Sequence, residues 1–407
     1  MSQIIKSSSS QSTKIAILGG GIGGLSLALA LHARGFRPTV FEQRPQARSI
    51  ADGLFLTLAP NGVNALRALG LSDIVAAEGI VMAGLAIHNE RGRRLIAVDY
   101  STHATRFGAP SVTMRRGALQ AILLDAANRA GLDLRQDMAI DRVAETGSGV
   151  TLHDAAGRGE AFDLLVAADG IWSRARRDIF PALPSPSYTG LVGTGGFVDM
   201  PDAPDTGGVM NMCFGHRAFF GFMKAAGGPL YWFGSHAASE AEARTQATPE
   251  AAAAHLRTLY SRDPLGIPDI VGRVTSLPSQ YPIYDMPELS RWHTDRVCLL
   301  GDAAHAVAPH SGQGASMAME DALVLAAAIE SEEQPRAAFA RFQALRQQRA
   351  GKAIKLGRFS GEQKRAQGWL ALRFRDLVLP IVMPMGVRAQ ESLFAYRADR
   401  DPLAPPV

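Results

Sequence analysis

The 407-residue sequence has only two cysteines, Cys213 and Cys298, which stand far apart in the chain. Two cysteines allow at most one disulfide, and they cannot supply the thiolate sets of structural zinc or iron–sulfur sites. We therefore expect neither a disulfide framework nor a metal site. Such a chain suits a reducing compartment, so the expected location is the cytoplasm.

The sequence also lacks dense blocks of basic residues. Its 42 Lys and Arg against 38 Asp and Glu give a formal net charge of +4 at pH 7. Surfaces that bind nucleic acid usually carry clustered Lys and Arg, so no nucleic-acid partner is predicted. A mildly basic protein remains compatible with anionic cofactors or substrates.

A third absence is an apolar run suited to crossing a bilayer, which takes about 20 residues. The uncharged stretch IAILGGGIGGLSLALAL (15–31) holds five glycines between positions 19 and 24. It has neither the basic start nor the cleavage site of a signal peptide. No transmembrane segment is predicted, and the polar residues 1–13 are expected to form a disordered tail.

The same glycine-rich stretch fits a loop that holds a dinucleotide. Residues 14–18 read as a buried strand, and Gly19, Gly21 and Gly24 then match G-x-G-x-x-G at the start of a predicted helix. A second predicted strand reaches Glu42, 18 residues after Gly24. In such a unit the glycines allow a tight turn, close approach of a pyrophosphate and helix–strand packing. The acidic residue binds a ribose hydroxyl.

Two later segments also end a predicted strand at an acidic residue and a glycine. They are DLLVAADG (163–170) and RVCLLGD (296–302). Open α/β sheets bind ligands at the carboxyl ends of their strands. A carboxylate such as Asp302, which closes a buried strand, is costly without a partner, and this favours a ligand-binding role.

The fold class predicted from these patterns is α/β. Between about 185 and 282 the pattern changes to strand-like segments, AFFGFM and LYWFGS, on either side of the turn KAAGGP, which indicates an antiparallel sheet. A chain of this length exceeds one comfortable core. The expected organisation is a discontinuous nucleotide-binding domain (14–75, 105–185 and 285–350), a substrate-binding β-sheet domain (76–104 and 186–284) and a C-terminal helical segment (351–407).

Taken together, the motifs resemble the single-component FAD-dependent class A monooxygenases, the aromatic hydroxylase family. The matching features are the G-x-G-x-x-G loop, Asp169-Gly170, Gly301-Asp302 with Pro309 and Gly312-Gln313-Gly314, and the arginine of an R-x-x-L motif, Arg116. The resemblance implies a Rossmann-like FAD-binding domain of the GR2 type with an inserted antiparallel β-sheet for the substrate.

The resemblance also implies residue roles. Asp302 would bind the ribityl chain of FAD, Pro309 would lie beside the isoalloxazine ring, and Asp169 would serve both FAD and NAD(P)H. A helix that begins at about 312–316 would direct its N-terminal dipole at the flavin's pyrimidine edge. The implied cofactor-binding residues are Gly19, Gly21, Ile22, Gly23, Gly24, Glu42, Gln43, Arg44, Arg116, Asp169, Gly301, Asp302, Pro309, Gly312, Gln313, Gly314, Ala315 and Ser316.

The implied reaction is NAD(P)H-dependent, O2-dependent hydroxylation of an aromatic or polyketide-like small molecule through a flavin hydroperoxide. Two alternatives stay open: epoxidation of an alkene by a relative of the same family, and a flavoprotein reductase without oxygen insertion. A flavin halogenase is disfavoured because the sequence has no W-x-W motif. The pattern leaves open NADH or NADPH, monomer or homodimer, and the identity of a catalytic base.

The substrate pocket is expected between the inserted sheet and the flavin. Strand alternation places about half of any such residue set on the wrong face. His305 and His310 have no evident acidic partner in the sequence, and Glu320 and Asp321 are expected to serve helix packing and solvation. The apolar segment 372–387, which Pro380 and Pro384 interrupt, is expected to cover the core or the pocket. The candidate lining residues are Phe197, Met212, Phe214, Phe220, Phe222, Tyr231 and Phe233.

Overall fold

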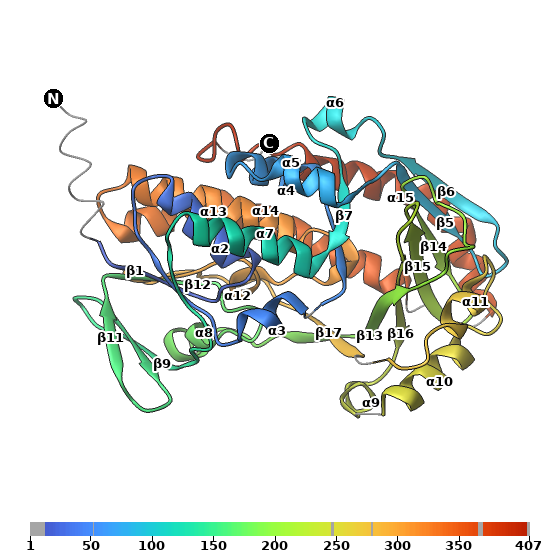
Figure 1. Cartoon of the computed structure of the whole chain (residues 1–407), viewed down its shortest axis with the longest axis horizontal. Helices are drawn as coiled ribbons and strands as arrows, with labels where there is room; N and C mark the ends of the chain where they lie inside the picture. Colours follow the sequence, from blue (N-terminus) through green and yellow to red (C-terminus); the bar gives the residue numbers. More distant parts are fainter. Residues whose placement is uncertain (1–12, 52, 246–247, 278–279, 365–368, 405–407) are drawn as a thin grey trace.

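The computed structural model describes residues 13–51, 53–245, 248–277, 280–364 and 369–404. The expected disordered tail, residues 1–13, lies outside the described residues except for Thr13. The chain has a mixed α/β fold, in which a parallel sheet and a larger mixed sheet occupy opposite ends of the molecule (Figure 1).

The parallel sheet is built from short apolar strands, and three of them, Ile15–Leu18, Leu164–Ala167 and Val297–Leu299, are completely buried. All its neighbouring strands run parallel, an arrangement that needs cover on both faces. Helices α2 (Ile22–His32), α7 (Arg116–Arg129) and α13 (Gly314–Ser331) pack side by side over it (Figure 1). The strand order is β18 (Val297–Leu299), β12 (Leu164–Ala167), β1 (Ile15–Leu18), β2 (Thr39–Phe41) and β8 (Asp133–Arg135).

The larger sheet has seven strands and corrects the expectation of a purely antiparallel sheet. Strands β14 and β5 pair in parallel, whereas the other neighbours are antiparallel. A parallel pair is possible here because β5 and β14 come from distant parts of the chain rather than from one hairpin. The order is β17 (Tyr281–Asp285), β13 (Ser187–Val198), β16 (Leu230–Ala237), β15 (Ala218–Lys224), β14 (Val209–Phe214), β5 (Gly84–His88) and β6 (Arg94–Asp99).

Smaller elements complete the fold. Two three-stranded sheets lie outside the main ones: β3 (Phe55–Leu58), β7 (Val112–Arg115) and β4 (Ile80–Val81), and β11 (Gly159–Phe162), β10 (Val150–Asp154) and β9 (Ile140–Glu145). The short helices are α3 (Gln46–Ala51), α4 (Pro60–Ala68), α5 (Ser72–Glu78), α6 (His103–Phe107), α8 (Arg174–Ile179), α9 (Glu240–Arg244), α10 (Pro249–Leu259), α11 (Ile267–Gly272), α12 (Asp302–His305) and the 3-10 turn η1 (Pro309–Ser311).

Two long helices close the chain. Helix α14 runs from Pro335 to Gln363, across the boundary expected at residue 350. Helix α15 (Trp369–Phe394) continues through Pro380 and Pro384, where the sequence had indicated an interruption. A proline removes one backbone hydrogen bond and can bend a helix without ending it. In the parts of the chain that the structure describes, no helix is long and apolar enough to span a membrane.

A buried ionic cluster joins α13 to α14, and it corrects the interpretation of Glu320 and Asp321 as solvated. Arg346 Nε lies 2.6 Å from Asp321 Oδ1, and its Nη2 lies 2.6 Å from Glu320 Oε2. Arg349 adds a bond of 2.7 Å to Glu320 Oε1. All four side chains are almost completely buried. The spacing of arginines along α14 gives no sign of partners 25 to 29 residues away.

His305 also belongs to this cluster, so the expectation that it has no acidic partner was wrong. Its Nε2 lies 2.6 Å from Asp321 Oδ2. Burial alone would raise the pKa of Asp321, but the charges of His305 and Arg346 lower it to about 2. The backbone N–H of Gly301 donates to the same carboxylate at 3.2 Å, which ties the cluster to the end of β18.

Replacing Arg346 by Met is expected to lower the free energy of unfolding by about 3–5 kcal/mol, because two buried carboxylates lose the cation that they share. Chemical denaturation of the purified variant measures this loss. The matched control is Arg341→Met on the same helix, where a partly exposed arginine pairs with Glu332. Its expected effect is about 0–1 kcal/mol. Equal losses in both variants would contradict a structural role for the cluster.

Candidate active site

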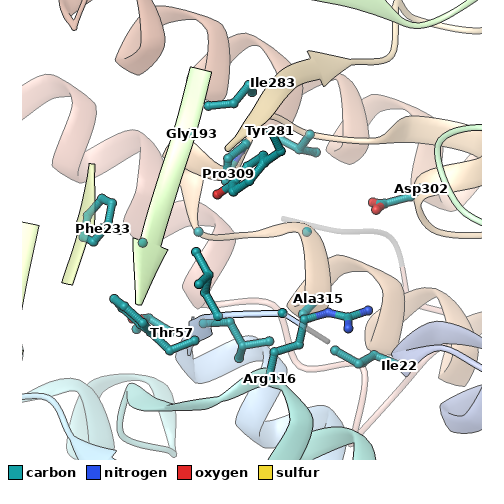
Figure 2. A pocket seen from close by; sticks show the side chains of 18 of the residues that line it. Ile22, Thr57, Arg116, Gly193, Phe233, Tyr281, Ile283, Asp302, Pro309 and Ala315 are labelled. Atoms are coloured by element: carbon teal, nitrogen blue, oxygen red, sulfur yellow. The ribbon is translucent and has the colours of Figure 1, made fainter. Parts of the chain in front are cut away.

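A large cavity separates the carboxyl end of the parallel sheet from the seven-stranded sheet. Its volume is about 1920 Å³, whereas a pocket for one small molecule measures roughly 300–1,000 Å³. In Figure 2, Phe233 and the strand that carries Gly193 stand at one side, Asp302 stands at the other, and Pro309 and Tyr281 lie between them. The space is therefore sufficient for a dinucleotide together with a second molecule.

Most of the residues predicted for a cofactor face this cavity, although they come from distant parts of the sequence. Gly24 and Ser316 are the exceptions among them. Those that line the cavity are Gly19, Gly21, Ile22, Gly23, Glu42, Gln43, Arg44, Arg116, Asp169, Gly301, Asp302, Pro309, Gly312, Gln313, Gly314 and Ala315.

Glycine is favoured for different geometric reasons at the positions where β1 turns into α2. Gly19 has a φ of +108°, and a Cβ atom there would lie 2.3 Å from the carbonyl oxygen of Ala168. A Cβ on Gly24 would lie 1.9 Å from the carbonyl oxygen of Gly19, so Gly24 packs the helix on the turn rather than facing the cavity. A Cβ on Gly21 would meet no atom within 4 Å. Among the glycines of this turn, only Gly21 is open to a ligand in this way.

Glu42 follows β2 and shapes the turn from the other side. Its Oε2 accepts a hydrogen bond of 2.8 Å from the backbone N–H of Gly20, and its Oε1 accepts one of 2.9 Å from that of Arg44. The carboxylate is thus held at the cavity wall with lone pairs still available, because each ionised oxygen accepts more than one hydrogen bond.

The two strand-end aspartates differ in their partners. Asp169 Oδ2 accepts hydrogen bonds from the backbone N–H groups of Arg174 and Ala175, at 2.7 and 3.2 Å. Its Oδ1 is buried and has no partner in the described part of the chain. Asp302 accepts no hydrogen bond from the described residues. Desolvation raises the pKa of both carboxyl groups, although the side chain of Asp302 faces the open cavity.

The loop between α12 and α13 brings Pro309 and the start of α13 to the cavity. Gly312 has a φ of +62° and ends the turn η1. The side-chain amide of Asn61, on α4, donates a hydrogen bond of 3.1 Å to Oε1 of Gln313. Ser316 does not reach the cavity as predicted, because α4 covers it: a Cβ on Gly62 would lie 2.3 Å from Ser316 Oγ.

The seven-stranded sheet lines the opposite side with aromatic residues, but only part of the predicted set is there. Phe197, Met212, Phe214 and Phe233 line the cavity, whereas Phe220, Phe222 and Tyr231 do not. Successive side chains of a strand point to opposite faces, and β15 directs Phe219 inward and Phe220 outward.

The outward-facing residues have a different role from the one predicted. The ring of Phe220 stacks on that of Trp232 with centroids 5.7 Å apart and lies 5.0 Å from the ring of Tyr260, in the core beneath α10 and α11. Phe222 packs against the same core. Unlike these two, Tyr231 lies on the same side of β16 as Phe233 and packs edge-on against Phe55 and Phe197, but it does not line the cavity.

Sequence patterns missed several residues that line the cavity. Phe55 of β3 lies 5.9 Å from the ring of Phe233, and the guanidinium of Arg115 lies 4.4 Å from the ring of Phe197. Lys364, near the end of α14, also lines the cavity. These contacts join residues far apart in the chain, and no local motif signals them.

Comparison with known proteins agrees with the fold and the motifs. Residues 12–360 match the family described as FAD binding domain. Aurachin C monooxygenase/isomerase of Stigmatella aurantiaca is 34% identical over 342 residues, 83% of this chain and 85% of the relative. FAD-dependent urate hydroxylase of Klebsiella pneumoniae is 30% identical over 339 residues, 82% of this chain and 85% of the relative.

The fold itself matches a crystal structure of Klebsiella pneumoniae HpxO in complex with FAD and uric acid. The TM-score is 0.84 at 24% identity, over 95% of this chain and 98% of that one. The fold and the family match define a flavoprotein enzyme. More particularly, this chain belongs to the FAD-dependent class A monooxygenases, the aromatic hydroxylase family, as its motifs had indicated.

The glycine geometry predicts different effects on the melting temperature for alanine at Gly24 and alanine at Gly21. Gly24→Ala places a methyl group against the carbonyl oxygen of Gly19 and is expected to lower the melting temperature by several degrees. Gly21→Ala adds the same methyl group where no atom lies within 4 Å, so the melting temperature of the FAD-free protein should change little. Thermal unfolding of both variants without FAD tests this, and a reversed order would contradict the turn geometry.

Proposed function

We propose that this enzyme uses FAD, NAD(P)H and O2 to hydroxylate an aromatic or polyketide-like small molecule. The observation that carries the proposal is the single cavity with two unlike ends. One end gathers the glycine turn, Asp302 and the start of α13, and the other is an aromatic wall. The loop at Pro309 lies between them (Figure 2).

The residues at the first end fit FAD. Gly21 leaves open space where a pyrophosphate would approach the backbone, and the first turn of α2 directs free N–H groups toward it. Asp302 is a cavity carboxylate without a hydrogen-bond donor among the described residues, and the hydroxyls of a ribityl chain would supply such donors. The buried, unpartnered Oδ1 of Asp169 adds a further acceptor.

The remaining roles follow the same cavity wall. Glu42, with Gln43 and Arg44, would hold the adenosine ribose, and Arg116 would lie along the ribityl-pyrophosphate stretch. Its aliphatic part packs beneath Gly53, where a Cβ would lie 2.9 Å from Arg116 Cδ. The N–H groups at the start of α13 would face the pyrimidine edge of the flavin and favour negative charge there.

When bound, FAD would supply the redox chemistry, the transfer of two electrons from NAD(P)H to O2 that lets one oxygen atom enter the substrate. The chain's own contribution is position and the exclusion of water. The aromatic wall, with Phe197, Phe219 and Phe233, would hold a planar substrate against the Pro309 loop. A dry site favours transfer of oxygen to the substrate over release of hydrogen peroxide.

NAD(P)H would enter from the open side of the cavity. Arg174 and Arg177 line the cavity and remain at least partly exposed. Their guanidinium groups suit the phosphates of a dinucleotide, because arginine binds phosphate oxygens bidentately.

The decisive experiment is NAD(P)H oxidation in air by the FAD-loaded protein, with and without a panel of phenols, quinolones and polyketides. We expect one class of compound to accelerate the oxidation and to gain one oxygen atom by mass spectrometry. An epoxide product would favour the alkene epoxidase instead. Oxidation without any oxygenated product from the panel would favour a reductase, and a protein that binds no FAD would refute the proposal.

Asp302→Asn is expected to weaken FAD binding by at least about tenfold, because a neutral amide forms weaker hydrogen bonds with ribityl hydroxyls than a carboxylate does. Titration of flavin fluorescence with the FAD-free protein measures this. The matched control is Asp141→Asn, an exposed carboxylate at the cavity edge. Equal affinities for the wild type and the Asp302 variant would remove Asp302 from the proposed FAD site.

A further inference from the structure

Lys364 lies directly after the last residue of α14 and lines the cavity. Its Nζ is 3.8 Å from the centre of the Phe219 ring and 5.8 Å from that of Phe233, on strands β15 and β16. The same Nζ is 3.1 Å from Nδ1 of His310, the residue after Pro309. One nitrogen atom therefore bridges the aromatic wall and the Pro309 loop.

Glycines on the neighbouring elements hold this arrangement in place. A Cβ on Gly361 would lie 2.9 Å from Cδ2 of His310, so α14 packs directly on the histidine. A Cβ on Gly221 would lie 2.2 Å from the ring of Phe233, so this ring lies flat over the glycine of the next strand. This close packing holds the side chains of His310 and Phe233, both of which lie near the lysine nitrogen.

The surroundings of Lys364 are poor in negative charge. Among the residues that the structure describes, no carboxylate oxygen lies within ion-pair distance of Nζ. Burial lowers the pKa of Lys364 to about 7. Burial, with the nearby charge of Lys364, lowers the pKa of His310 to about 2. His310 is therefore neutral near pH 7, and its Nδ1 accepts a hydrogen bond from the lysine.

Helix capping does not account for this geometry. A lysine at a helix C-terminus often donates to the last free carbonyl groups, but within the described chain the hydrogen-bond partner of Lys364 Nζ is His310. The amine is half-buried against aromatic rings and has no counter-ion among the described residues, which is costly unless it has a partner. The partner that the cavity offers room for is a ligand.

We propose that Lys364 binds and deprotonates an acidic hydroxyl of an aromatic substrate, which makes it a catalytic residue that selects phenol-like compounds. This inference rests on the proposed function. The ring of the substrate would pack against Phe219 and Phe233, and its hydroxyl would meet Nζ. The O–H bond breaks as an N–H bond forms on Lys364, and no electrons are transferred.

After this step the lysine is an ammonium next to a phenolate oxygen, and His310 Nδ1 still accepts one of its protons. The aromatic ring of a phenolate is richer in electrons than that of a phenol, which favours attack by an electrophilic oxygen. The cavity wall also carries other charged residues, among them Arg115, Arg116 and Asp302. A guanidinium group has only hydrogen-bond donors, so neither of these arginines offers an acceptor for the proton.

The test compares binding of 4-nitrophenol with binding of 4-nitroanisole, its methyl ether, to the FAD-loaded full-length protein. Equilibrium dialysis gives the affinities, and the difference absorbance spectrum reports whether bound nitrophenol is ionised. We expect the wild type to prefer 4-nitrophenol by at least about tenfold and to bind it as nitrophenolate, even in buffer slightly more acidic than its pKa. Equal binding of the two probes would overturn the proposal.

Lys364→Met is expected to lose both the preference and the nitrophenolate spectrum while it keeps FAD. The matched control is Lys352→Met, an exposed lysine on the same helix, which should behave like the wild type. Lys364→Arg retains the charge but accepts no proton. The Lys364→Arg variant should bind nitrophenolate in alkaline buffer, but in the more acidic buffer the absorbance spectrum of bound nitrophenolate should be absent. An unchanged spectrum in Lys364→Met would refute the role in proton transfer.

The outcome separates this inference from the proposed function. Oxygenation of methyl ethers as fast as of the parent hydroxyl compounds, unaffected by Lys364→Met, would refute the inference and leave the monooxygenase intact. A wild type that binds nitrophenolate through Lys364 but oxygenates nothing in the panel would refute the proposed function and keep Lys364 as a ligand-binding residue.

Discussion

The cavity depends on one buried ionic cluster. Asp321 joins Arg346, His305 and the backbone N–H of Gly301, so the end of β18 and the helices α13 and α14 meet at one carboxylate. Glu320 extends the cluster through Asn61 to α4, with a hydrogen bond of 2.6 Å. Such groups are costly to bury singly and stable only together. Their mutual dependence determines where Asp302 and the Pro309 loop stand.

The cavity combines two kinds of surface that come from different sheets. The parallel sheet contributes backbone N–H groups, turns and carboxylates, which suit a ligand of fixed shape. The seven-stranded sheet contributes rings, which suit flat molecules of many kinds. The relatives compared above are named for different reactions.

Local patterns predicted the nucleotide-binding half well. The glycine turn, Glu42 and the strand-end aspartates depend on residues close in sequence, and the structure gathers them at one cavity. On the seven-stranded sheet, the predictions for Phe220 and Phe222 were wrong. A shift of one position along a strand moves a side chain to the other face of the sheet, and the sequence does not show which face lines the cavity. Arg346 and Lys364 depend on partners that only tertiary packing supplies. Sequence patterns therefore predicted the cavity-lining residues more reliably around the glycine turn than on the seven-stranded sheet.

Helix α14 carries Arg346 in the ionic cluster, and Lys364 at the cavity follows its last residue. The two residues are separated along the helix axis by about 27 Å. An α-helix resists stretching along its axis, so α14 keeps a fixed distance between Arg346 in the ionic cluster and the amine of Lys364. A change in side-chain size at Arg346 would thus alter the distance between the amine and the ring it faces. Substitutions along α14, far from the cavity, would therefore change substrate choice without any change in the cavity wall.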